Sequence, residues 1–152
     1  MIQWQCLSFD QLSNQQLYDL LRLRVDVFVV EQTCPYPELD GHDHHPEVMH
    51  LLGYQAGQLV ACARLLPPGI TYPNASIGRI ATHLDVRKQK LGHQLVNKAL
   101  TVAEQQWPES DIEIGAQHHL VAFYQQHGFS ITSEMYLEDG IPHIDMIRRR
   151  AR

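Results

Sequence analysis

Hydrophobic residues recur along this chain with two periods, one typical of helices and one typical of strands. Over residues 14–31 apolar side chains lie three or four positions apart, and Ser13 stands where an N-cap residue would begin that helix. Residues 48–54 and 59–65 are apolar runs on either side of the short turn QAGQ, which predicts a β-hairpin. The pattern therefore predicts helices and strands in one chain.

The second half of the chain alternates predicted strands with predicted helices. A buried strand is expected over residues 76–84, and the helix that follows it begins near Leu91 and ends before Pro108. The remaining expected elements are a first strand at 2–7, a polar loop at 32–47, a strand at 111–115, a helix at 120–127, and two last strands joined through the EDG turn at 138–140. This order predicts an α/β (α+β) protein.

Length and composition limit the possible functions. The 152 residues, 44% of them hydrophobic, suffice for one buried core, so we expect a single domain over residues 1–152. Twelve basic against seventeen acidic residues give a formal charge of −5, which argues against nucleic-acid binding and favours a cationic substrate. With no signal-peptide pattern and no run near about 18 apolar residues, we expect a cytoplasmic protein without membrane association. Three scattered cysteines predict reduced thiols.

Three of the twelve basic residues lie within four positions, in the segment LDVRKQKLGHQL at residues 84–95. There the predicted strand gives way to a helix, whose N-terminus presents unpaired N–H groups and partial positive charge. Arg87, Lys88 and Lys90 would add full charges to that end. Gly92 would let a diphosphate approach the backbone. We interpret the segment as a phosphate site; a solvated surface loop is the alternative.

The same segment resembles the acetyl-CoA motif of the GNAT superfamily of N-acetyltransferases. That motif reads Arg or Gln, two residues, Gly, one residue, then Gly or Ala, directly after a buried strand. Arg87 and Gly92 match its first and last positions, and Lys90 stands where the motif has its first glycine. The resemblance implies acetyl-CoA as co-substrate.

A second segment, GAQHHLVAFYQQHGF at residues 115–129, resembles a later helix of the same superfamily. In that helix a Tyr stands four residues before a Gly-Phe pair, as Tyr124 stands before Gly128 and Phe129 here. Gly128 also suits the left-handed residue that ends a helix, which would pack Phe129 near Tyr124. The resemblance implies that Tyr124 protonates the departing CoA thiolate; an aromatic residue of the core is the alternative.

Over essentially the whole chain, the sequence resembles the ElaA-like subgroup of this superfamily. The further segments that carry the resemblance are LRLRVDVFVVEQTCPYPELDGHD at 21–43, IGRIA at 77–81 and EDGIPHIDM at 138–146. It implies the GNAT fold, a mixed central β-sheet of about seven strands flanked by helices, with strand 76–84 splayed from its neighbour. The acetyl-CoA residues expected on this basis are Ile80, Ala81, Thr82, Arg87, Lys88, Gln89, Lys90, Leu91, Gly92, His93, Gln117 and Phe123. Main-chain groups of the first three would hold the pantetheine arm and polarise the thioester carbonyl.

Two side chains are candidates for the general base. Glu31, at the end of the first predicted helix, could take a proton directly or through a water; a surface carboxylate is the alternative. His143 follows the EDGIP turn, and a neutral imidazole can accept a proton from an ammonium near pH 7; a packed, hydrogen-bonded histidine is the alternative. Arg24 and Arg79 are expected to pair with an interior acid such as Glu31, with anchoring of a substrate carboxylate left open.

The segment DGHDHHPEVMH at residues 40–50 holds four histidines and three acids. Its spacing matches no zinc signature, so no metal is expected. Asp40 and Asp43 are instead expected to form an acidic rim that attracts a cationic amine, with a plain DG turn as the alternative.

Together these features predict an N-acetyltransferase in which a primary amine attacks the thioester of acetyl-CoA without a covalent enzyme intermediate. The expected acceptor is a small-molecule amine or a protein amine, and the expected state is a monomer or a homodimer. The alternative is a non-catalytic GNAT-like module that senses acyl-CoA or binds a partner.

Overall fold

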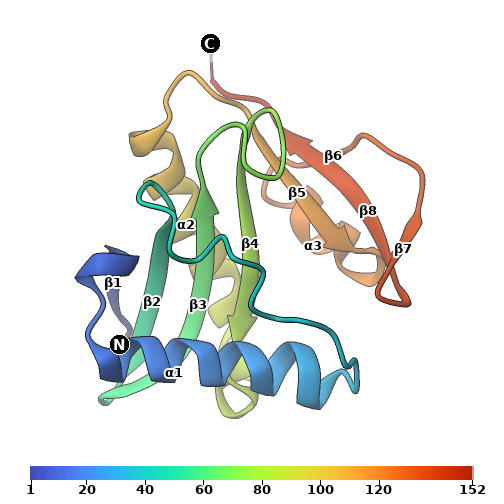
Figure 1. Ribbon diagram of the computed structural model, residues 1–152. Coiled ribbons are helices and arrows are strands. Elements are labelled where there is room, and N and C mark those ends of the chain that lie inside the picture. The colour runs from blue at the N-terminus through green and yellow to red at the C-terminus, as the bar shows by residue number, and fades with distance from the viewer. Residues whose placement is uncertain (152) are drawn as a thin grey trace.

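A β-sheet with helices on both faces forms the framework of the protein (Figure 1). The computed structural model describes residues 1–151, apart from the side chains of Lys88 and Gln89. The strands are β1 (Gln3–Ser8), β2 (Met49–Gln55), β3 (Gln58–Leu66), β4 (Ala75–Thr82), β5 (Ile112–Gln117), β6 (Ser130–Ile131), β7 (Tyr136–Glu138) and β8 (Ile141–Arg148). Within the described residues these eight strands form one sheet in the order β1-β2-β3-β4-β5-β8-β6, and β7 also pairs with β8. β4 and β5 are parallel and the other pairs antiparallel, so the sheet is mixed, as expected.

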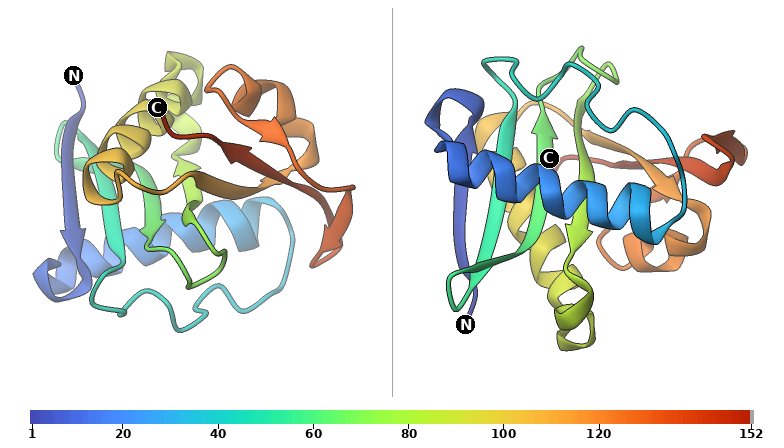
Figure 2. Two further views of the ribbon diagram at one scale, coloured as in Figure 1. Left: turned by 90° about the horizontal axis from the view of Figure 1, so that it is seen from above. Right: turned by 60° about the horizontal axis from the view of Figure 1, so that its bottom comes forward.

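The longest helices lie on opposite faces of this sheet (Figure 2). One face is covered by α1 (Asn14–Val25), which continues into the π-helical segment η2 (Asp26–Glu31). The other face carries α2 (Leu91–Gln106) and the short α3 (Val121–Gln125). The short 3₁₀ helices are η1 (Phe9–Gln11), η3 (Leu84–Gln89) and η4 (His118–Leu120). No helix within residues 1–151 is both long enough and apolar enough to cross a membrane.

The alternation of side chains along the strands builds one apolar cluster on each face. Leu52 of β2 packs with Leu20 and Leu23 of α1. Its neighbour Leu51 packs in the cluster that contains Leu95 of α2. Both faces of the central strands are therefore buried, and we refer to them as the α1 face and the α2 face.

Ser13 begins α1, as the sequence predicts. Ser13 Oγ accepts a hydrogen bond from Gln16 N at 3.0 Å, and Gln16 Oε1 accepts one from Ser13 N at 2.9 Å. This reciprocal pair is a capping box, which satisfies two donors at the helix start. The helical course extends to Glu31, the predicted end, although its last six residues have π geometry.

β4 and β5 separate after a short stretch of pairing, which involves only Ala75 and Ser76 of β4. Further along, the register of β4 on β3 shifts between Gly78 and Ala81, and Arg79 has a left-handed backbone with φ of 49°. Such a bulge bends a strand and increases its twist. The splayed strand expected from the resemblance is thereby confirmed.

The observed elements differ from the predicted ones at three places. β4 ends at Thr82, and residues 84–89 form η3. α3 is limited to Val121–Gln125 because the turn η4 precedes it. β6 brings the sheet to eight strands instead of about seven, since its two residues are too few for periodicity to reveal.

Candidate active site

A pocket of about 500 Å³ lies where β4 and β5 diverge. Its lining includes Ile114 and Ala116, which belong to the apolar cluster of the α2 face. It also includes Gly115 and Gln117, which alternate with them and so point to the α1 face. Both faces of one strand can line a pocket where the neighbouring strand has moved away. The pocket therefore passes through the sheet and connects its two faces.

Tyr124 lines this pocket from the α2 face. The residue is 7% exposed, and its ring meets Phe123 and Phe129 edge-on, with centroids 5.1 and 5.9 Å away. Gly128 has φ of 86°, and Phe129 N donates to Tyr124 O at 3.2 Å, which is the predicted helix end. Burial raises the pKa of Tyr124 to about 12. Tyr124 is thus a protonated hydroxyl held in one orientation at the pocket wall.

His143 lines the pocket from the α1 face, opposite Gln117 in the β5–β8 register. Its Nδ1 lies 2.8 Å from Ile141 O, so this bond assigns the proton of the neutral ring to Nδ1. Nε2 then carries the lone pair and lies 3.5 Å from Glu138 Oε2. A ring nitrogen with a lone pair, on a side chain that lines the pocket, suits a general base.

Glu31 and Arg87, predicted as a base and a phosphate ligand, face each other outside this pocket lining. Arg87 Nη1 lies 2.6 Å from Glu31 Oε2, and Arg87 Nη2 lies 2.7 Å from Glu31 Oε1. The guanidinium also donates to Thr82 O, at 3.2 Å from Nε and 3.0 Å from Nη2. Both carboxylate oxygens of Glu31 therefore have a partner, and the pair ties η2 to the end of β4.

The predicted phosphate segment folds as η3 and the first turn of α2. Lys90 precedes α2 with φ of 57° and ψ of 26°, the left-handed conformation that a glycine adopts readily. A lysine thus adopts a left-handed backbone where the motif has its first glycine, at a strain of about 1 kcal/mol. Leu91 is buried, and the Cβ position of Gly92 lies 3.5 Å from the ring of Phe123.

His93, in the first turn of α2, packs against Phe123 with ring centroids 4.6 Å apart. His93 Nδ1 lies 2.9 Å from Nε2 of His127, beyond the end of α3. These contacts tie the helix of Tyr124 to the phosphate segment. The predicted contacts of Lys88 and Gln89 involve side chains outside the described residues.

The four other predicted cofactor residues lie on β4 and β5. Ile80 and Gln117 line the pocket. Ala81 is 3% exposed and packs in the cluster of the α1 face, and the carbonyl of Thr82 is held by the guanidinium described above. The structure thus brings Ile80 and Gln117 to the same pocket that Tyr124 and His143 line.

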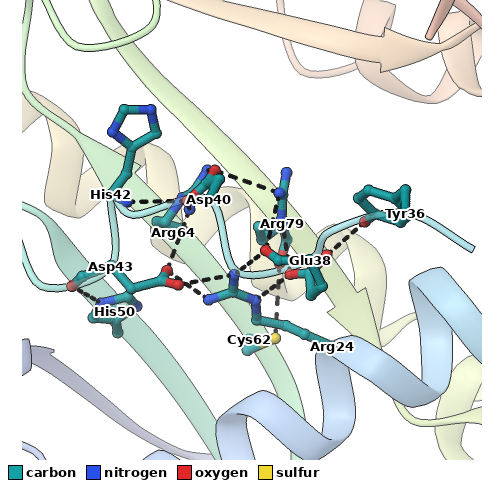
Figure 3. Close-up of polar contacts among 10 residues, drawn as sticks. All are labelled: Arg24, Tyr36, Glu38, Asp40, His42, Asp43, His50, Cys62, Arg64 and Arg79. Atoms are coloured by element: carbon teal, nitrogen blue, oxygen red, sulfur yellow. Dashed lines mark hydrogen bonds and ion pairs between the residues drawn. The ribbon is translucent and has the colours of Figure 1, made fainter. Parts of the chain in front are cut away.

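Arginines and acids form a partly buried ion network that borders the pocket (Figure 3). Arg24 is 1% exposed; its Nε donates to Glu38 Oε2 at 2.6 Å and its Nη1 to Asp43 Oδ1 at 2.7 Å. Arg64 of β3 donates to both oxygens of Asp40 at 2.8 Å. These bonds hold the loop between η2 and β2 against the sheet.

Arg79, from the bulge of β4, completes this ion network. Its Nε donates to Glu38 Oε2 at 2.8 Å, and Tyr36 OH donates to the other oxygen of Glu38 at 2.5 Å. The prediction that Arg24 and Arg79 pair with an interior acid is confirmed, but the acid is Glu38 and not Glu31, which binds Arg87. Three arginines face three carboxylates, so the charges balance: Arg24, Arg64 and Arg79 against Glu38, Asp40 and Asp43.

The expectation of an acidic rim at Asp40 and Asp43 is wrong for Asp43, which is buried, and Asp40 reaches the surface only as a partner of Arg64. Asp43 is 5% exposed and bonded to Arg24 and Arg64, which also holds Asp40. Burial opposes ionisation of the two carboxyls, but the arginines outweigh it and lower the pKa of both. These acids therefore fix the loop instead of presenting free negative charge.

The histidine-rich segment at residues 40–50 also contributes to holding the fold together. His50 is fully buried, and its Nε2 lies 2.9 Å from Asp43 O. Among the described residues, no group of three or more His, Cys, Asp or Glu side chains is arranged to hold a metal ion.

A second polar cluster, which the sequence analysis does not predict, lies on the α1 face of the pocket. Tyr72 OH and Tyr136 OH both donate to Asp145 Oδ1, at 2.8 and 2.7 Å. A Cβ on Gly115 would lie 3.0 and 3.1 Å from these two hydroxyl oxygens. The tyrosines come from a loop and from β7, so no local spacing links them to β8. The available signal is the strand alternation that puts Asp145 on the same face as His143.

The chain matches known proteins over nearly its whole length. The family described as "Acetyltransferase (GNAT) domain" matches residues 14–150. Protein ElaA of Escherichia coli is 46% identical over 97% of each chain, and its crystal structure superposes with a TM-score of 0.92, covering 98% of this chain and 100% of that one. An acyl-CoA N-acyltransferase from Pseudomonas aeruginosa gives a TM-score of 0.93 at 44% identity, with the same coverage. An aminoglycoside 6′-N-acetyltransferase complexed with coenzyme A shares the fold, with a TM-score of 0.70 at 17% identity over 95% of this chain and 96% of that one. The chain therefore belongs to the GNAT acetyltransferase family and, within it, to the ElaA-like proteins.

Proposed function

We propose that this chain is an N-acetyltransferase that transfers the acetyl group of acetyl-CoA to a primary amine by direct attack. The observation that carries the proposal is the pocket between β4 and β5, which has Tyr124 on the α2 face and His143 on the α1 face. A passage through the sheet lets two substrates approach from opposite faces and meet in a fixed orientation.

In this proposal acetyl-CoA lies on the α2 face. The N-terminus of α2 and the charge of Lys90 favour the diphosphate there. Beyond Ser76 the edge of β4 is not paired with β5, so its backbone groups are available to the amides of the pantetheine arm. For Arg87 to bind phosphate it must share or exchange its contacts with Glu31.

The proposed reaction is a direct displacement at the thioester carbon. The amine nitrogen attacks this carbon, a C–N bond forms, and the C–S bond breaks. His143 Nε2 takes the proton of the amine, and Tyr124 gives its proton to the departing sulfur. Backbone N–H groups near the bulge of β4 would stabilise the negative charge on the carbonyl oxygen. The products are the acetylated amine and CoA.

A covalent route through Cys34 is not part of the proposal. Cys34 lines the pocket, but its thiol donates to Asp139 O at 3.3 Å, a contact that does not remove its proton. A nucleophilic cysteine requires a thiolate, which needs an adjacent base or positive charge.

The test is calorimetric titration with acetyl-CoA and CoA, followed by an assay of thiol release with a panel of primary amines. The proposal predicts binding and amine-dependent release of CoA, with the acetylated amine found by mass spectrometry. Binding without turnover of any amine would support the alternative, a module that senses acyl-CoA. Folded protein that binds neither compound would reject the cofactor.

A further inference from the structure

We propose that the acceptor is a diamine or polyamine, whose second, non-reacting ammonium binds at the cluster of Tyr72, Tyr136 and Asp145. The inference rests on the proposed function of the pocket and names its substrate class. It follows from the charges, hydrogen-bonding capacity and spacing of the α1-face wall.

The positive charges of the pocket lining already have partners. Arg64 and Arg79 line the pocket, and each is bonded to carboxylates of the ion network. A substrate carboxylate would have to displace one of these buried contacts. On the opposite wall, Tyr72 and Tyr136 carry no charge and donate to Asp145 behind them, and the Glu138 carboxylate lies 3.5 Å from the imidazole of His143. The wall that faces the arginines is thus suited to a cation.

The two hydroxyl groups have acceptor capacity left for such a cation. Tyr72 and Tyr136 belong to the pocket lining, and each donates its proton to Asp145 Oδ1. The two hydroxyls also contact each other, but each phenol oxygen has two lone pairs, so acceptor capacity remains, and a charged partner strengthens it. Burial, and then Asp145, raises the pKa of both tyrosines, so they stay protonated. Two oxygens backed by one negative charge match the N–H donors of an ammonium.

Gly115 keeps these oxygens open to the pocket. It lies opposite Asp145 in the β5–β8 register and lines the pocket itself. A side chain here would contact both hydroxyl oxygens, because its Cβ alone would lie 3.0 and 3.1 Å from them. A residue without a side chain leaves room for a ligand at this position.

The spacing along β8 sets the length of the acceptor. His143 and Asp145 lie two positions apart on the same face, and two residues of a strand span about 7 Å. An extended chain of four or five methylenes holds two amine nitrogens roughly this far apart. One amine would therefore lie near His143 while the other lies at the cluster.

The experiment compares kcat and KM for 1,4-diaminobutane, 1,5-diaminopentane and n-butylamine, each with saturating acetyl-CoA. The wild type is expected to favour both diamines over the monoamine. Asp145→Asn keeps an oxygen that can accept from the tyrosines but removes the charge. It should lower kcat/KM for the diamines about tenfold or more, mainly through KM, and leave n-butylamine within about twofold.

Matched variants separate this role from a structural one. Glu134→Gln removes one negative charge from an exposed site outside the pocket lining. It should leave the ratio of kcat/KM between the diamines and n-butylamine unchanged. Tyr72→Phe and Tyr136→Phe should each reduce the preference for diamines by a smaller factor. An equal loss for diamines and n-butylamine in Asp145→Asn would make Asp145 only a positioning residue and overturn the inference.

The outcomes also separate this inference from the proposed function. Equal wild-type efficiency for diamines and n-butylamine would overturn the inference and leave the acetyltransferase intact. If no amine is acetylated, calorimetric titration of 1,4-diaminobutane into the CoA-saturated protein tests whether the cation site exists. Binding weakened by Asp145→Asn would support the cation site while the proposed function fails, and absence of binding would overturn the site.

Discussion

Two polar regions lie close together in this protein, and they use their charges in opposite ways. In the ion network, every arginine contacts a carboxylate and the charges balance (Figure 3). At the gap between β4 and β5, Tyr124, His143 and the two tyrosines bonded to Asp145 keep donor or acceptor capacity toward the pocket. Mutually satisfied charges hold a backbone in place, whereas capacity left open at a pocket is available for chemistry.

The two regions nevertheless depend on each other. The loop held by the ion network contributes Tyr36, Asp40 and His42 to the pocket lining. Arg79 belongs to both regions, since it lies in the bulge where β4 turns away from β5. We therefore expect changes in the network to affect stability first, and changes at the gap to affect turnover at nearly constant stability.

Arg24→Met gives the largest expected effect, because it removes a fully buried cation that is bonded to both Glu38 and Asp43. Removing one member of a buried ion pair costs about 3–5 kcal/mol. Urea unfolding should show a loss of this size. Arg22→Met is the matched control on the same helix, since the Arg22 side chain is 72% exposed and lies 3.9 Å from Asp26. The control should stay within about 0.5 kcal/mol of the wild type. Equal free energies of unfolding for Arg24→Met and Arg22→Met would contradict the structural role of the network.

Tyr124→Phe is the corresponding change at the gap. It removes the proposed proton donor and keeps the ring packing, so kcat should fall about tenfold to a thousandfold. Calorimetry should give an acetyl-CoA affinity close to that of the wild type. Tyr18→Phe, at a residue that is 68% exposed, serves as the control. Normal turnover by Tyr124→Phe would end the assignment of this residue as the acid.

His143→Gln and Glu31→Gln decide between the two candidate bases. We expect His143→Gln to lower kcat about tenfold to a hundredfold, because His143 lines the pocket. We expect Glu31→Gln to lower it less than about threefold, because both oxygens of Glu31 already bind Arg87. Steady-state assays at pH 7 measure both. The opposite order of effects would transfer the role of base to Glu31.

The features that the sequence predicts are those that depend on residues close together in the chain. Periodicity and capping signals describe contacts within a few residues, so the helix after Ser13 and the helix end at Gly128 follow from the sequence. The resemblance to GNAT proteins supplied the splayed strand and Tyr124. The left-handed backbone of Lys90 could not be read from a lysine, because few lysines adopt it.

The parts that were not predictable depend on residues far apart in sequence. Arg79 meets Glu38 across 41 positions, and Tyr72 meets Asp145 across 73. Such pairs have no period or spacing, and they form only when the sheet brings the strands and loops together. For this reason the sequence does not predict the arginine partners that the fold gives to Asp40 and Asp43.

The central claim is that acetyl transfer takes place in the gap between β4 and β5. Gly78 tests it most directly, because it lines the pocket opposite Arg64 in register, and a Cβ there would meet no atom within 4 Å. Gly78→Phe should fill the pocket, with Gly78→Ala as control, and the measurement is amine-dependent release of CoA. We predict that Gly78→Phe lowers the rate of amine-dependent CoA release about a hundredfold or more, with little change in its free energy of unfolding. Gly78→Ala should release CoA at nearly the wild-type rate. Wild-type turnover by folded Gly78→Phe would contradict the claim.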